Sequence, residues 1–368
     1  MFVPQFNKSV YYWLLTGSFL VFAMVMVGGI TRLTGSGLSI VKWDLWHGTI
    51  PPTNDTDWNH VFELYKQSPQ YKIVNYDFTL ADFKNIFWWE YIHRLLGRLT
   101  GIVFIVPFLF FWLTKKLDPV LMRRLFIIFL LGGLQGALGW FMVKSGLVDN
   151  PHVSHYRLAA HLLAAFTVFG YIFWTALEYK QANTPSGKIS PAERDFKIFR
   201  FSILTFVFLV LQIMYGAFVA GLKAGRVYNT FPLMEGKFFP DALSLNGITD
   251  DITTVQFMHR MLAYTVTLCV IYLWWRCRKE LWLKQSATTL LVIILLQFLL
   301  GVITLLSAVN IYAALLHQTG AFLLFAGFIR HLHVMKVGFE KAQPAYSATG
   351  DSATGDSAAG ATVSGTFK

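Results

Sequence analysis

The sequence is poor in charge and in cysteine. Charged residues make up 14% of its 368 residues, whereas soluble domains have about 25%. This deficit excludes an ordinary soluble globule, and an apolar content of 55% excludes a disordered chain. The two cysteines, Cys269 and Cys277, lie eight residues apart in one apolar run. That is roughly 12 Å along a helix, too far for a disulfide, so no disulfide framework is expected.

The net charge of +11 comes from basic residues in short segments between apolar runs. They form no single basic patch, so nucleic acid is a poor candidate for a partner. The lipid bilayer is the expected environment instead.

Long apolar runs dominate the chain and predict an all-α polytopic membrane protein. The predicted spans are 10–31, 86–113, 121–143, 156–178, 199–222, 253–275, 286–309 and 311–335. Runs of this length cross a hydrocarbon core of about 30 Å. Each must be helical, because backbone groups find no other hydrogen-bond partner in lipid.

The basic loops orient these spans. Lys115–Lys116, Lys180–Arg200 and Arg276–Lys284 follow spans two, four and six. Positive loops stay in the cytoplasm, so both termini are predicted to be cytoplasmic. The N-terminus has neither a signal peptide nor an Arg-rich transit peptide, which favours a bacterial plasma (inner) membrane. Residues 343–368 repeat Ser-Ala-Thr-Gly-Asp and predict a disordered cytoplasmic tail.

The chain contains an internal duplication. Residues 35–52 match 223–240 at four positions without gaps, and His-Arg recurs at 93 and 259. Four spans per half give both halves the same orientation, so the repeat is parallel. We therefore predict two pseudosymmetric four-helix bundles, in residues 1–180 and 181–342.

Four histidines fall near the starts of the even-numbered spans: His93, His161, His259 and His317. One such histidine is usually a hydrogen-bonded packing residue, but four at matching depth indicate ligands. Two imidazoles from facing helices suit the axial positions of a haem iron, whereas zinc prefers three or four ligands. The pairs are predicted to be His93 with His161 and His259 with His317.

Basic side chains surround these histidines. Arg32, Arg94, Arg98, Arg157 and Arg260 are candidates for holding haem propionates or for anchoring at the membrane interface. The remaining histidines carry less: His47, His60, His152 and His155 are expected to be solvated. His331 and His333 are expected to contact lipid headgroups.

The two halves differ beside their histidines. Glu90 lies three residues before His93, while the same offset from His259 gives Gln256. A carboxylate takes up a proton or stabilises a nearby positive charge, whereas an amide does not accept the proton. Glu90 is therefore the candidate catalytic residue, in a catalytic N-terminal half beside an electron-transferring C-terminal half. The alternative is that Glu90 only pairs with Arg94 or caps the helix.

An ordered set of motifs resembles the haem A synthase family. The motifs are Gly29-Ile-Thr-Arg-Leu-Thr-Gly-Ser-Gly-Leu-Ser, Phe87-Trp-Trp-Glu-Tyr-Ile-His-Arg-Leu-Leu-Gly-Arg, Tyr156-Arg-Leu-Ala-Ala-His, Val227-Tyr-Asn-Thr-Phe-Pro-Leu-Met, Met258-His-Arg and Leu316-His-Gln. Together they cover positions 29 to 318, and they match the bacterial, eight-helix type without a cysteine pair in the first external loop.

The resemblance implies an oxidoreductase that converts the C8 methyl of haem O into a formyl group, giving haem A for cytochrome oxidase. It implies a substrate haem O held by His93 and His161 and a haem b cofactor held by His259 and His317. The family's essential carboxylate falls on Glu90. Haem O synthase is a candidate partner, and a homo-oligomer is one option. The sequence does not identify the membrane electron donor or acceptor.

Two rival functions use the same residues differently. A quinol-linked di-haem b electron carrier would need the four histidines but not Glu90. A transporter would more often place its polar groups at mid-membrane, whereas here they lie near one face. For the enzyme, the first external loop, 33–85, is expected to cover the substrate, with Trp43, Trp46 and Trp58 as its apolar side chains.

Overall fold

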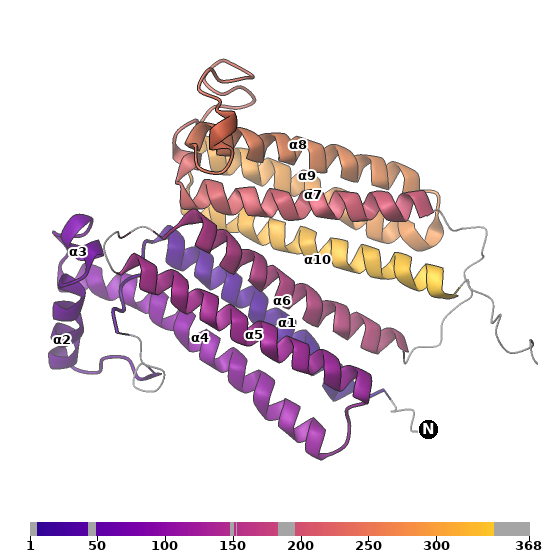
Figure 1. Cartoon of the computed structure of the whole chain (residues 1–368), viewed down its shortest axis with the longest axis horizontal. Coiled ribbons are helices and arrows are strands. Elements are labelled where there is room, and N and C mark those ends of the chain that lie inside the picture. Colours follow the sequence, from indigo (N-terminus) through magenta and orange to yellow (C-terminus); the bar gives the residue numbers. More distant parts are fainter. Residues whose placement is uncertain (1–5, 43–48, 148–150, 152, 183–195, 342–368) are drawn as a thin grey trace, which may run out of the picture.

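In the computed structural model the chain forms two bundles of long helices that lie side by side (Figure 1). The structure describes residues 6–42, 49–147, 151, 153–182 and 196–341. The first bundle contains α1 (Lys8–Leu33), α4 (Leu80–Leu113), α5 (Pro119–Gly146) and α6 (His155–Ala182). The second contains α7 (Phe196–Gly221), α8 (Ile252–Cys277), α9 (Leu281–Leu306) and α10 (Ile311–Lys341).

All eight of these helices are long and apolar enough to cross a membrane, which confirms the predicted spans. The shorter elements are α2 (Asp55–Lys66), α3 (Pro69–Ile73) and the 3-10 turns η3 (Ala224–Arg226) and η4 (Leu245–Gly247). Sequence analysis did not foresee α2 and α3. The described residues contain no β-strand, so the all-α fold class is confirmed within them.

Side chains that bind free backbone groups set where the helices begin. Thr79 and Asp82 form a capping box at α4, each accepting the backbone N–H of the other. α4 therefore starts at Leu80, not near 86 as predicted. His93 then lies roughly 20 Å along the helix from its first residue. The first turns of α4 extend beyond the bundle and meet α2 and α3 (Figure 1).

The helices of each bundle follow the same cyclic order. α1 packs on α4 and α6, and α5 packs on α6; likewise α7 packs on α8 and α10, and α9 on α10. The bundles meet through α6–α7, α1–α10 and α6–α10. If each helix is replaced by its counterpart in the other half, the α6–α7 contact becomes the α10–α1 contact. The α6–α10 contact maps onto itself. This arrangement is consistent with the predicted pseudo-twofold repeat.

One apolar core runs through both bundles. Phe166 and Phe169 of α6 contact Phe322 of α10 with ring centroids 5.1 and 4.3 Å apart. Polar ties add to this interface: the Gln318 side chain donates to the Val25 carbonyl at 2.7 Å, and Lys336 donates to Glu178 at 2.9 Å. The bundles are therefore parts of one packed body.

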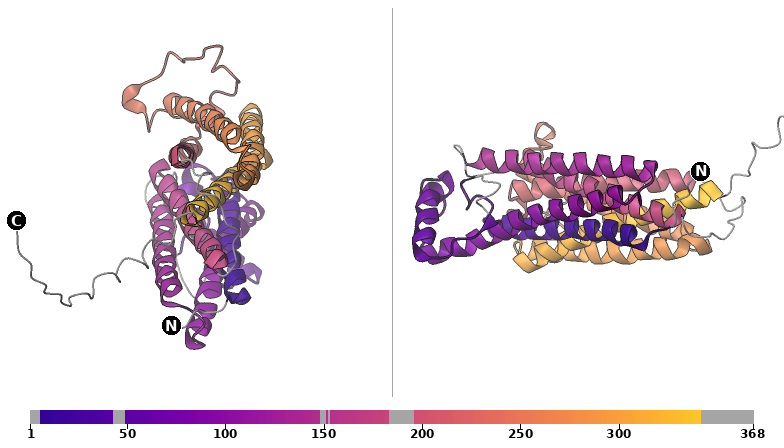
Figure 2. Two further views of the ribbon diagram at one scale, coloured as in Figure 1. Left: turned by 90° about the vertical axis from the view of Figure 1, so that its right-hand side faces the viewer. Right: turned by 90° about the horizontal axis from the view of Figure 1, so that it is seen from below.

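The loops gather at the two ends of the helices. The α2–α3 segment and the loop between α7 and α8 lie at one end, whereas α1 begins and α10 finishes at the other (Figures 1 and 2). The four predicted ligand histidines lie toward the end that carries the long loops, because α4, α6, α8 and α10 all begin there.

Several histidines outside the candidate site lie in unexpected places. His331 is completely buried, with its Nδ1 2.9 Å from the Ser286 hydroxyl, and His333 lies 3.4 Å from Glu178. The predicted headgroup contact was therefore wrong. His155, predicted to be solvated, is largely buried against the Tyr156 and Phe218 rings. His60 is exposed as predicted, whereas His47 and His152 lie outside the described residues.

Candidate functional site

Each of the four predicted ligand histidines lies against a glycine of a neighbouring helix. A Cβ atom at that glycine would fall 3.1 Å from the His93 ring at Gly28, 3.0 Å from His161 at Gly139, 3.2 Å from His259 at Gly216 and 2.9 Å from His317 at Gly301. These distances are shorter than ordinary van der Waals contact, so a larger residue would displace the imidazole. These glycines lie on α1, α5, α7 and α9. The helices α1 and α7 occupy matching places in the two bundles, as do α5 and α9.

The imidazoles fit axial ligation of a haem. Nδ1 of His161, His259 and His317 is buried without a hydrogen-bond partner among the described residues. His93 is near enough to His161, and His259 to His317, for the charges of each pair to interact. The described part of the chain has no cluster of three or more His, Cys, Asp or Glu side chains suited to a metal ion. The donor set therefore suits two-ligand centres better than zinc sites.

The residues that support these rings were not predicted from the sequence. Gln135, Gln212 and Gln297 each lie four residues before a supporting glycine. The amides of Gln135 and Gln212 lie 3.4 Å from Nε2 of His161 and His259, which is long for a hydrogen bond. The recurring Gln-x-x-x-Gly spacing was the available signal. On α1 the corresponding residue is Met24.

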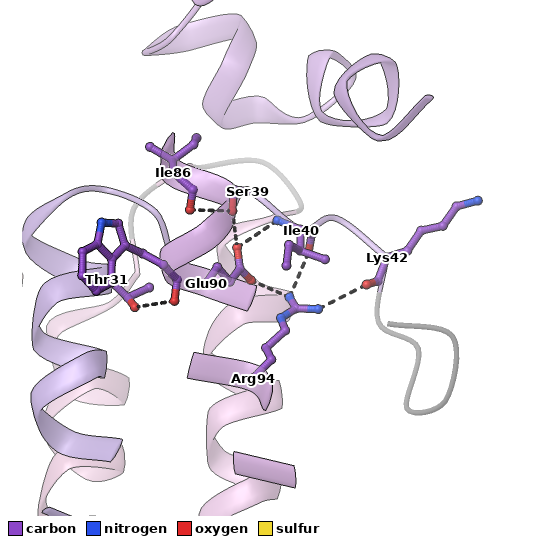
Figure 3. A network of polar contacts seen from close by, with 8 residues as sticks. Thr31, Ser39, Ile40, Lys42, Ile86, Glu90 and Arg94 are labelled. Atoms are coloured by element: carbon purple, nitrogen blue, oxygen red, sulfur yellow. Dashed lines mark hydrogen bonds and ion pairs between the residues drawn. The ribbon is translucent and has the colours of Figure 1, made fainter. Parts of the chain in front are cut away.

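Glu90 is buried and hydrogen-bonded through both carboxylate oxygens at the loop-rich end of the first bundle (Figure 3). Its Oε2 accepts from the Ser39 hydroxyl and the Ile40 N–H, both at 2.8 Å. Its Oε1 pairs with Arg94 at 2.6 Å. The predicted alternative, pairing with Arg94, is thus present in the structure. Carboxylate and guanidinium are thus buried together, and each has the other as its partner.

The arginines that follow His93 and His259 each hold the long loop of their own half. Arg94 donates to the Ile40 and Lys42 carbonyls at 2.8 and 3.2 Å. Arg260 donates to the Tyr228 and Thr230 carbonyls, both at 2.9 Å. The acceptors are related by the offset of 188 residues that aligns the two loops. These matching hydrogen bonds from an arginine to two loop carbonyls, which we call the loop clamp, further support the duplication.

Within that shared clamp, the charges differ. Gln256 in the second half donates to the Tyr228 carbonyl at 2.9 Å, at the place where Glu90 accepts from Ile40 in the first. Val227 stands where the first half has Ser39. The first half therefore has a buried carboxylate beside its histidine and the second half has none. At this matching position only the first half has a carboxylate, where the second half has a neutral amide.

The segment between α1 and α4 has a small apolar core of its own. Trp58, Phe62 and Tyr65 of α2 pack on Phe83 and Phe87 of α4. Trp58 is thus buried in the loop core, with its ring 5.0 Å from that of Phe87, while Trp43 and Trp46 lie outside the described residues.

Hydrogen bonds tie this loop core to the end of α1. Burial raises the pKa of Tyr65 to about 12, so its hydroxyl stays neutral beside Gln70. The Gln70 amide in turn donates to the Gly35 carbonyl at 2.7 Å. The loop is therefore a folded cap held at both α1 and α4.

Comparison with known proteins identifies the family. The family described as cytochrome oxidase assembly protein matches residues 11–329. The haem A synthase of Nitrosospira multiformis is 46% identical over 339 residues, covering 90% of this chain and 94% of that protein. The chain belongs to the haem A synthase family. The haem A synthases of Flavobacterium psychrophilum, 44% identical over 89% of this chain and 98% of that protein, and of Paramagnetospirillum magneticum, 46% identical over 89% and 94%, are also similar.

Three further arginines of this haem A synthase family member were predicted to hold propionates or anchor at the interface. Arg157 lies over the Phe141 ring, 4.5 Å from its centroid, which ties α6 to α5. Arg32 ends α1 within range of the charge of Arg226, and Arg98 is half-buried one turn beyond Arg94. For all five arginines the propionate role stays a prediction.

Proposed function

We propose that this chain is a haem A synthase: a membrane oxidoreductase that oxidises the C8 methyl of haem O to a formyl group. Membership in the family supports this activity directly. The observation that carries it in the structure is the asymmetry of a duplicated site. Two pairs of histidines have matching glycine supports, but only the first pair has a buried carboxylate beside it.

The asymmetry divides the work between the bundles. We assign the substrate haem O to residues 1–180, with His93 and His161 as axial ligands. We assign a haem b cofactor to residues 181–342, with His259 and His317 as axial ligands. A haem held by two imidazoles supplies a reversible one-electron centre. The neutral amide of Gln256 suits a site that only exchanges electrons.

Residues of the first bundle provide the chemistry of proton and charge. The substrate carbon is oxidised twice, through an alcohol and a hydrated aldehyde that loses water. Overall the carbon gains one oxygen atom from water and gives up four electrons and four protons, and the electrons leave to a membrane electron acceptor. We assign Glu90 to take up a proton or to offset positive charge that develops during these oxidations. Ser39 and Arg94 orient its carboxylate, and the folded loop cap limits access of water from above.

The location of the protein, its orientation and its partners follow from this assignment. We place the protein in a bacterial plasma membrane with both termini in the cytoplasm and the four histidines toward the outer face. Haem O synthase is the candidate partner that delivers substrate, and a homo-oligomer is compatible with the fold. The 343–368 tail lies outside the described residues.

Haem extraction tests the activity. The chain is produced in a bacterial host that makes haem O but no haem A, and membrane haems are separated by chromatography. We expect haem A to appear and haem O to fall, relative to the same host without the chain. Bound haem b with an unchanged haem O pool would instead identify a di-haem electron carrier.

A further inference from the structure

The two bundles differ in how their second and third helices meet. α8 and α9 pack extensively, whereas the matching helices α4 and α5 touch only sparingly. Toward the loop-poor end, a stacked pair formed by Phe104 and Phe129 bridges α4 and α5 with centroids 6.3 Å apart. The interface between α4 and α5, which we call the α4–α5 seam, is therefore sparsely packed in the half that lies toward the histidines.

Matching positions explain the difference. In the second bundle, Phe298 of α9 packs on Tyr264 of α8 at 5.5 Å, and Phe231 of the external loop packs on Phe298 at 6.1 Å. Aligning the histidines and their supporting glycines places Arg98 opposite Tyr264 and Gly136 opposite Phe298. The aromatic contact that closes the α8–α9 seam thus has no equivalent between α4 and α5.

The open seam leads to a predicted ligand. Gly132, Gly136 and Gly139 lie on one face of α5, at helical spacings of four and three residues. A Cβ atom at Gly132 or Gly136 would meet nothing within 4 Å. The same holds at Gly101 of α4. Gly139, the last residue of this face, supports the ring of His161, whose Nδ1 is buried without a partner among the described residues.

We propose that the α4–α5 seam is the passage through which haem O enters from the bilayer and haem A leaves. The proposal rests on the proposed function and deepens it. Haem O has an apolar macrocycle, a long isoprenoid tail and two charged propionates, so it partitions into lipid with its propionates at the interface and reaches the site from within the bilayer. A substrate must exchange at every turnover, whereas a cofactor must stay. The open, glycine-lined α4–α5 seam suits the exchange of a substrate. The α8–α9 seam, closed by an aromatic contact, suits the retention of a cofactor.

Closing one seam and opening the other tests the proposal. Gly136→Phe introduces the residue found at the matching position of the second bundle, and Phe298→Gly is the reciprocal change. Purified proteins in lipid nanodiscs are mixed with haem O, and uptake and release are followed by the absorption change on histidine ligation. The rate constants and the equilibrium affinity are measured separately.

For Gly136→Phe we expect the association and dissociation rate constants for haem O to fall together, by about tenfold or more, with an unchanged Kd. For Phe298→Gly we expect faster loss of haem b to a haem-binding acceptor protein. A weaker Kd with unchanged rates of entry would place Gly136 inside the site, and unchanged kinetics would place the passage elsewhere. Either result would overturn the proposal. Failure of the wild-type protein to bind haem O would instead count against the proposed function.

Discussion

Glycine decides where an imidazole lies in each bundle. Gly301 and Gly139 allow His317 and His161 to lie against α9 and α5 at distances that leave no room for a Cβ. Leucine at either position would overpack the contact, at a cost of about 1–3 kcal/mol. We expect Gly301→Leu to remove haem from the second bundle alone, and Gly139→Leu to abolish haem O binding while haem b stays bound.

The measurement is the content of each haem type in the purified variants, relative to protein. About 1.4 kcal/mol corresponds to a tenfold change in affinity, so the loss is large enough to detect. Each variant serves as the control for the other, because the changed residues are in different bundles. Loss of both haems in both variants would show a general folding defect and would remove the support for two separate sites.

The helices and loops differ in how well the sequence predicts them. The spans were predictable because each apolar run must satisfy its backbone within one helix. α2 and α3 were missed because they are short amphipathic segments in a polar loop. The burial of His331 was missed because a histidine near the end of a span has the same local sequence whether it faces lipid or Ser286.

The remaining contacts at the site were not predicted because they involve backbone groups or the absence of a side chain. Matching histidines and the Glu90–Gln256 difference were visible in the sequence because they are identities of side chains. The loop clamps of Arg94 and Arg260 were not visible, because their acceptors are carbonyl groups that every residue has. The glycine supports act through the absence of a side chain, which becomes meaningful only once the facing helix is known.

The first loop stands as a folding unit on top of α4, with Trp58 buried in its core. Replacing a buried tryptophan with alanine costs about 3–5 kcal/mol. We expect Trp58→Ala to open the loop locally, so that limited proteolysis cleaves within 55–73 while the spans remain intact. Trp275→Ala is the control, because that side chain is 52% exposed and lies in α8, outside the loop core. Equal protease resistance of the two variants would contradict a separately packed cap.

At the scale of the whole molecule, the direction of insertion fixes the side of the membrane on which the histidine-bearing, loop-rich end lies. The loop-rich end carries α2 and α3, whereas α1 begins and α10 finishes at the opposite end (Figure 2). Reporter fusions after Lys116, Lys188 and Lys279 should report the cytoplasm, and fusions within 50–80 or 236–250 should report the outside. An outside signal after Lys188 would reverse the account of both bundles.

The division of labour between the bundles is tested most directly by Glu90→Gln. The change preserves size, imitates the residue at Gln256, and removes the only buried carboxylate of the described network at the first site. The measurement is the ratio of haem A to haem O and hydroxylated haem in membranes, at matched protein levels, together with the content of haem b. Glu63→Gln, in the exposed part of α2, is the control.

We expect the variant to keep its haem b and to accumulate haem O or the alcohol, with haem A reduced by at least about two orders of magnitude, the size of a lost general base. The Glu63 variant should match the wild type. A near-normal haem A yield from Glu90→Gln would show that this carboxylate only holds the external loop, and would contradict the assignment of the chemistry to the first bundle.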